Sequence, residues 1–359
     1  MYRWEWHSLR RSGLLWALIV LVPLLAGLIF IKNQTDQQAD RQLLLARLTT
    51  TNSALKTAAL QLGERRKETT NKQQKRILNT QLNRLQPLAD AADDQLTGLY
   101  NEDNTQFLKS GERVVVLSRN YRRDIDPGRE QIVFSEARYT QQLAWYRRIQ
   151  KAGLGFENAH SLRYPNFFFN LLQWFCAPAT LLVLAICLHL TRLQDHWRGS
   201  NDLLRQNLSR AGRWPLARLG FDATVWLGLL GVALFGAGVL LVFAGQSLFS
   251  DTQGGWQYPL IVMGTTFMPL ITACWRIILS GFLLFLVWTT LLSWAERYIR
   301  QPAGYVIAGV LVLAVGLSQW LTATQGMLLL SGWRYIAWLG GLVIAGLIAV
   351  LLTMRAYAR

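Results

Sequence analysis

The residue types that commonly carry enzyme chemistry are few in this chain and widely scattered. Four histidines and three cysteines occur in 359 residues, and they form no cluster typical of a zinc site. The chain also lacks the Gly-x4-Gly-Lys-Ser/Thr loop that holds nucleotide phosphates and the Gly-x-Ser-x-Gly turn that presents a nucleophilic serine. We therefore expect no catalytic residue, metal or cofactor in this chain, and no enzyme activity of its own. The residues concerned are His7, His160, His189, His196, Cys176, Cys187 and Cys274.

The densest group of charged residues is a basic segment, residues 191–222, which separates two long apolar runs. Short loops that are rich in arginine stay on the cytoplasmic side of a membrane. We therefore expect this segment to be cytosolic, with its arginines acting as orientation signals. It contains six arginines and three aspartates: Arg192, Arg198, Arg205, Arg210, Arg213, Arg218, Asp195, Asp202 and Asp222.

Part of this segment follows the pattern acid-x3-Gly-Thr/Ser-x2-Leu-Leu-x4-Ser-Arg. The two adjacent leucines form the apolar ridge of a short amphipathic helix, which can dock in a groove of a soluble partner. The pattern resembles the segment after the second span in type-2 ABC transporter permeases, with Asp in place of the usual Glu and Asn207 where proline is common. The resemblance implies a coupling helix, near residues 195–210, that sits on an ATPase subunit. The alternative is an ordinary interfacial loop. The matching residues are Asp195, Gly199, Ser200, Leu203, Leu204, Ser209 and Arg210.

The composition is that of an integral membrane protein. Hydrophobic residues make up 52% of the chain, which contains fifteen tryptophans, and the net charge of +16 comes largely from residues that flank apolar runs. We therefore expect contacts with membrane lipids and no nucleic-acid partner. Six apolar runs have the length of a transmembrane helix, so the predicted fold class is an all-α integral membrane protein. The predicted spans are 14–32, 167–190, 223–245, 272–294, 304–321 and 335–354.

The first span separates two polar parts of the chain. Residues 1–13 combine tryptophans with arginines, as an interfacial helix on the cytosolic side does. Because the first span then crosses outward, we expect residues 33–165 to form a large extracytoplasmic helical domain. Its basic residues do not contradict this location, since long loops translocate regardless of charge. Leucine stripes predict a hairpin of two long helices in this domain, with a turn within 63–71, and a further helix over about 127–152. Whether this domain is a stalk or a ligand-binding cap stays open.

The remainder, residues 166–359, is predicted to be a five-helix transmembrane region. The apolar stretch over 246–301 could hold one or two spans, and a single span keeps the basic carboxyl-terminal tail on the cytosolic side. Residues 258–271 are then a re-entrant or an interfacial segment. Arg276 is expected at the outer interface, where it anchors the helix or binds an anionic substrate. Glycines in the third span permit close helix contact. His189 is expected to be a solvated or capping residue near the cytosolic boundary.

The order of these segments resembles a type-2 ABC exporter subunit over nearly the whole chain. The resemblance implies a permease that is energised by a separate ABC ATPase, which binds ATP and Mg, and that works with a second permease copy or a related permease. The predicted spans contain no Asp or Glu, which disfavours an ion-driven carrier and favours an amphipathic cargo such as a lipid, a peptide or a hydrophobic drug. The expected location is a bacterial cell membrane, with multiple spans and both termini cytosolic. The alternative is a non-transporting envelope sensor, immunity or anchoring protein. No substrate-binding residue is predicted.

Overall fold

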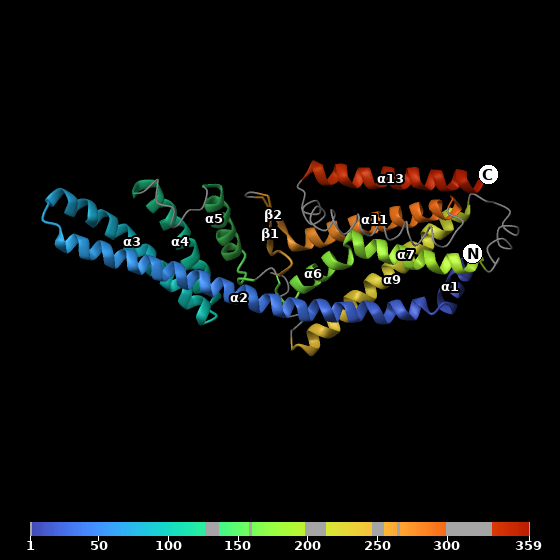
Figure 1. Ribbon diagram of the computed structural model, residues 1–359, viewed down its shortest axis with the longest axis horizontal. Helices are drawn as coiled ribbons and strands as arrows, with labels where there is room; N and C mark the ends of the chain where they lie inside the picture. Colours follow the sequence, from blue (N-terminus) through green and yellow to red (C-terminus); the bar gives the residue numbers. More distant parts are fainter. Residues whose placement is uncertain are drawn as a thin grey trace. The chain divides into compact units, whose positions relative to one another are not determined.

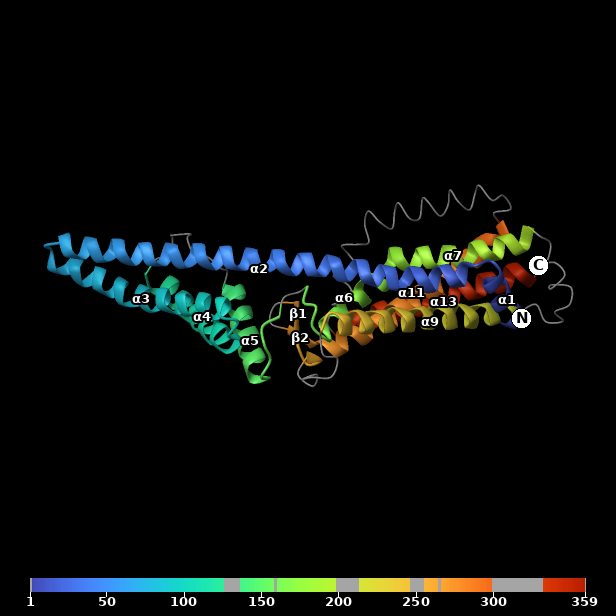
Figure 2. The same ribbon diagram turned by 90° about the horizontal axis from the view of Figure 1, so that it is seen from below.

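A computed structural model describes residues 2–125, 136–157, 160–197, 213–245, 255–263, 266–298 and 332–358. The chain divides into two compact units. The first, the span unit, comprises Met1–Ile31, Arg163–Ser250 and Ile271–Arg359. The second, the polar unit, comprises Lys32–Leu162 and Asp251–Leu270. Helices dominate both units (Figures 1 and 2).

The span unit contains the apolar helices, including the apolar first part of α2. Its elements are α1 (Tyr2–Arg11), the start of α2 (Leu14–Glu68), α6 (Asn166–Phe175), α7 (Pro178–Trp197), α9 (Arg213–Phe243), α11 (Leu270–Tyr298) and α13 (Trp333–Ala358). Within the described residues, four stretches are long and apolar enough to cross a membrane: Leu14–Glu68, Leu216–Phe243, Leu270–Trp294 and Trp333–Arg355. The chain is therefore mostly helical and has the character of a membrane protein. The predicted span at 304–321 lies outside the described residues.

The predicted second span is a bent pair of helices. α6 and α7 meet at an angle of 55°, and together they would make a fifth crossing. Proline lacks a backbone N–H and is tolerated at the first turn of a helix, so Pro178 begins α7 where α6 has ended. α11 packs closely at this break, because a Cβ on Gly281 would lie 2.8 Å from the Sγ of Cys176. Glycine at position 281 is therefore required by this packing.

α2 and α9 are in ordinary van der Waals contact at Gly236. A Cβ on Gly236 would lie 3.5 Å from the Cβ of Pro23. Gly236 therefore faces α2, but an added Cβ would fit there, and the predicted close packing at the glycines of this span stays a prediction. Gly228 and Gly231 differ, since a Cβ at either position would meet nothing within 4 Å.

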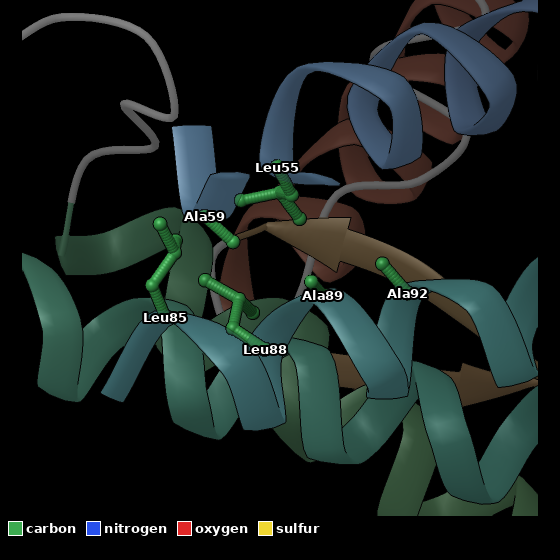
Figure 3. Close-up of a cluster of buried hydrophobic side chains, with 6 residues drawn as sticks. All are labelled: Leu55, Ala59, Leu85, Leu88, Ala89 and Ala92. Atoms are coloured by element: carbon green, nitrogen blue, oxygen red, sulfur yellow. The ribbon is translucent and has the colours of Figure 1, made fainter. Parts of the chain in front are cut away.

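The polar unit is built on a hairpin of α2 and α3 (Lys72–Tyr100), which agrees with the predicted turn. α2 continues without a break from its apolar stretch to Glu68, and Asn71 caps α3 by accepting hydrogen bonds from the backbone N–H groups of Gln73 and Gln74. The two helices pack through small and branched apolar side chains that face one another in Figure 3. These side chains are Leu55, Ala59, Leu85, Leu88, Ala89 and Ala92.

Two further helices and a β-hairpin complete this unit. α4 (Asn104–Ile125) packs against α3, and α5 (Glu136–Lys151) packs against α4. The helix predicted over 127–152 corresponds to α5, and α4 was not predicted individually. The strands β1 (Pro259–Met263) and β2 (Thr266–Pro269) pair antiparallel, and β1 contacts α5. Residues 258–271, predicted as a re-entrant or interfacial segment, thus contain an unpredicted hairpin, which is an exception to the all-α expectation.

Candidate functional site

Four charged side chains from three helices of the span unit meet in a buried ion network. They are Glu5 of α1, Arg192 of α7, and Arg218 and Asp222 of α9. Each is at most 3% exposed. Charged groups are almost never buried this completely unless they are paired. The network is therefore the most unusual chemical feature among the residues that the structure describes.

Arg192 lies at the centre of the network. Its two terminal nitrogens contact the two carboxylate oxygens of Asp222, at 2.5 Å and 3.2 Å, in a bidentate pair. Its Nε donates to one oxygen of Glu5 at 3.3 Å, and the Nε of Arg218 donates to the other oxygen at the same distance. Two positive and two negative groups thus balance. A neutral network of this kind can remain buried, whereas the loss of one member leaves an uncompensated charge.

The local sequence explains how α1 and α9 present these groups. Residues four apart lie on the same face of a helix, so Glu5 and Leu9 both point inward from α1, while Arg10 and Arg11 are exposed. The same spacing places Arg218 and Asp222 on one face of α9. Apolar contact reinforces the ionic contact, because the ring of Trp6 packs edge-on against that of Phe221, with the ring centroids 5.5 Å apart.

Glu5 is held in its ionised form by the arginines. Burial raises the pKa of its carboxyl, but the charges of Arg192 and Arg218 and the hydrogen bonds they donate outweigh that effect, and the pKa falls below the ordinary value. At neutral pH Glu5 therefore carries its negative charge, which the network needs for its balance. The network joins α1 to the ends of α7 and α9 through charge as well as packing.

His189 lies one turn before Arg192 on α7 and belongs to the same buried region. It is 2% exposed. Its Nε2 lies 3.0 Å from the carbonyl oxygen of Thr289 and 3.4 Å from the hydroxyl of Ser293, both on α11. Because a carbonyl oxygen only accepts, Nε2 carries the hydrogen in this contact. The prediction of a solvated or capping histidine was wrong, because His189 is buried and joins α7 to the interior of α11.

The structure also corrects the interpretation of the basic segment. The sequence predicts orientation signals at Arg192 and Arg218, but both side chains are buried and ion-paired. Asp222 is 1% exposed and lies within the apolar stretch Leu216–Phe243. The one local signal in the sequence is the spacing of four between Arg218 and Asp222, which places opposite charges on one helix face but does not identify their partners on other helices.

The residues assigned to the coupling helix fall mostly outside the described part of the chain. Asp195 lies in the last turn of α7, three residues beyond Arg192. The other six, Gly199, Ser200, Leu203, Leu204, Ser209 and Arg210, lie within 198–212, which is outside the described residues. The described helices on either side, α7 and α9, both contribute to the buried ion network.

Arg276 makes a helix-packing contact at the beginning of α11. Its guanidinium carbon lies 4.6 Å from the centroid of the Tyr335 ring on α13, and the Tyr335 hydroxyl donates to the backbone oxygen of Arg276 at 3.2 Å. A guanidinium over an aromatic ring is attracted by the ring's electrons. This residue therefore joins α11 to α13, whichever of its two predicted roles it has.

Metal ligands do not gather anywhere in the described ranges, where no three His, Cys, Asp or Glu residues are placed to hold an ion. All three cysteines are free thiols. Comparison with known proteins adds no assignment, since no family model, curated protein or solved structure matches this chain.

Proposed function

We propose that this chain is the permease subunit of an ATP-driven exporter of the type-2 ABC kind. In this proposal the chain crosses a bacterial cell membrane six times, with both termini and residues 191–222 in the cytosol and residues 33–165 outside. The chain has no ATPase activity of its own. A separate ABC ATPase binds ATP and Mg and drives the permease through residues 195–210, and a second permease copy or a related permease completes the transporter.

The observation that carries this proposal is the place of the buried ion network in the chain. Arg192 lies three residues before Asp195, and Arg218 lies eight residues after Arg210. The two helices that leave the coupling segment are thus joined to each other through Asp222 and to α1 through Glu5. Separating such buried charges is costly. A push on the segment would therefore move α1, α7 and α9 together, as force transfer from an ATPase requires.

The same network argues against an ion-driven carrier. Such carriers use intramembrane carboxylates that gain and lose a proton or a cation. Asp222 is such a carboxylate by position, but a bidentate contact with Arg192 occupies both of its oxygens. An amphipathic cargo, such as a lipid, a peptide or a hydrophobic drug, remains the best match to spans composed mainly of apolar and small residues.

The proposed orientation can be tested with single cysteines in a cysteine-free background. In intact cells, an impermeant thiol reagent should label a cysteine at Asn104 and should leave a cysteine at Ser200 unlabelled until the cells are opened. The opposite pattern would overturn the orientation and with it the cytosolic docking segment.

The partner can be identified by purifying the chain from its own host in mild detergent. We expect a P-loop ATPase to be present in equal amount, together with ATP turnover that the separated ATPase lacks. Recovery of the chain without an ATPase would favour the rival function, an envelope sensor, immunity or anchoring protein. The two outcomes differ by the presence of one polypeptide and are distinguished by mass spectrometry.

A further inference from the structure

The end of the α2–α3 hairpin is strongly basic. Six basic and two acidic residues between Glu64 and Arg76 leave a net charge of +4. All six basic side chains are exposed, and none makes an ion pair with any residue that the structure describes. We name this surface the basic tip, and its residues are Arg65, Arg66, Lys67, Lys72, Lys75 and Arg76.

Several other basic residues of the polar unit pair with nearby acids. Lys56 pairs with Asp93 at 2.6 Å, and Arg147 pairs with Glu112 at 2.8 Å. These pairs join different helices of the same unit. The basic tip thus differs from the rest of the unit in having an excess of positive charge.

The charges of the tip do not serve the stability of α3. The amino terminus of a helix carries partial positive charge and favours acidic side chains. The first turn of α3 contains no acidic residue, and Lys72, Lys75 and Arg76 lie in its first two turns. Like charges spaced three or four residues apart on a helix also repel one another. The other three basic residues, Arg65, Arg66 and Lys67, lie in the last turn of α2, where the helix dipole favours them. The three on α3 oppose local folding, and their presence beside an already positive helix end points to a role in binding.

The tip is nevertheless well defined in structure. Three residues, 69–71, connect α2 to α3 (Figures 1 and 2). The Thr69 hydroxyl donates to the carbonyl of Arg65 at 2.6 Å, and the Asn71 side chain accepts from the backbone of Gln73 at 2.9 Å. These bonds fix the two helix ends and hold the six charges in a small region. A bound anion would meet a preorganised surface.

From these observations we infer that the basic tip binds a linear polyanion whose charges are phosphate groups. Arg65, Arg66 and Lys67 are consecutive, so they project over about 200° around α2, and the other three lie on a second helix. A single anion cannot contact side chains that are spread in this way, whereas a flexible chain of phosphates can. Arginine and lysine both bind phosphate oxygens through charge-assisted hydrogen bonds.

Two other anionic ligands, a single-stranded nucleic acid and a lipid headgroup layer, match the basic tip less well. Residues 60–80 contain no aromatic side chain, so the bases of a single-stranded nucleic acid would have nothing to stack on. The same absence disfavours insertion at a lipid headgroup layer, where tryptophan and tyrosine are enriched.

The test uses the full-length protein in nanodiscs of zwitterionic lipid, with long-chain inorganic polyphosphate as the probe. We expect the native protein to bind polyphosphate at 50 mM salt, and each tip triple variant to weaken binding by at least tenfold and to reduce its salt dependence. A control triple, which removes equal charge from exposed positions elsewhere in the polar unit, should change the affinity by less than twofold. The tip variants are R65Q/R66Q/K67Q and K72Q/K75Q/R76Q, and the control is K109Q/R113Q/K151Q.

Each contrary outcome overturns the inference. Equal weakening by the control triple would assign binding to net charge alone. Tighter binding of single-stranded RNA than of polyphosphate at equal charge would assign the tip to nucleic acid, and binding of anionic vesicles without binding of polyphosphate would assign it to a membrane. The inference does not depend on transport, so failure here leaves the proposed function intact. All substituted side chains are exposed, and an unchanged unfolding temperature would confirm that the variants fold.

Discussion

Replacing Arg192 by methionine tests whether the buried ion network holds the span unit together. Methionine keeps a long unbranched side chain and removes the charge, so Asp222 loses the guanidinium that contacts both of its oxygens. Breaking a buried pair in this way costs about 3–5 kcal/mol. At a conversion of about 2 °C for each kcal/mol, the midpoint of unfolding in detergent should fall by at least about 6 °C. The matched control is Arg11→Met, an exposed residue of α1, which should change stability by less than about 0.5 kcal/mol.

A second substitution separates the effect of charge from that of shape. Arg192→Met together with Asp222→Asn removes one charge of each sign and restores the balance. The double variant should therefore be more stable than the Arg192→Met single variant, with a coupling energy of about 0.5–3 kcal/mol. If Arg192→Met is as mild as the Arg11→Met control, or if the double variant loses the sum of both single effects, the reasoning about charge balance is wrong.

Three further predictions concern the polar unit. Gly98→Ala should destabilise this unit by about 1–3 kcal/mol in thermal unfolding, because the new Cβ would lie 2.6 Å from the backbone nitrogen of Phe107; an unchanged midpoint would contradict the close approach of α3 and α4. Gly63→Ala should instead stabilise α2 by up to about 1 kcal/mol, since a Cβ there meets nothing within 4 Å and alanine favours the helix. Hydrogen bonds from Lys56 and Asn52 lower the pKa of the Asp93 carboxyl below its ordinary value of 3.8. Its contribution to stability is therefore complete above that value and is lost as the pH falls through the lowered pKa, so Asp93→Asn should flatten the loss of stability in acid. An identical acid profile in that variant would remove Asp93 from the acid response.

The apolar helices could be predicted from the sequence because the thickness of the bilayer core sets the length of a membrane-spanning helix. A helix that crosses the bilayer needs about twenty apolar residues, and five of the predicted spans coincide with apolar helices. Hydropathy does not report continuity, however. It gave no sign that α2 runs from Leu14 through to Glu68, or that the break before Pro178 divides α6 from α7.

The polar unit was predicted less completely because weaker signals decide its elements. The leucine spacing identified the α2–α3 hairpin, and Leu55 and Leu85 are indeed buried in its core. α4 was missed since Gly111 and three consecutive valines interrupt its helical pattern. The apolar residues of β1 and β2 have the same composition as a membrane segment, and only their pairing with each other identifies them as strands.

The buried ion network could not be predicted from the sequence, because its contacts join distant residues. Glu5 lies 187 residues from Arg192 and 213 from Arg218. Arginines beside an apolar run ordinarily serve as orientation signals, and Arg192 and Arg218 fit that rule by position although both are buried. Only the tertiary fold distinguishes an arginine that faces the cytosol from one that is paired in the interior.

The central claim, that residues 195–210 connect this chain to an ATPase, is tested most directly by ATP turnover of the reconstituted complex. A leucine that is buried in a groove contributes about 1.5–3 kcal/mol, so Leu203→Asp or Leu204→Asp, which also adds an unpaired charge, should weaken ATPase binding at least about tenfold and abolish transport-linked turnover. The control Gln206→Ala should behave as the native protein, and the abundance of all three variants in the membrane should be unchanged. Undiminished ATPase binding and turnover in both leucine variants would contradict the claim and leave the segment an orientation loop.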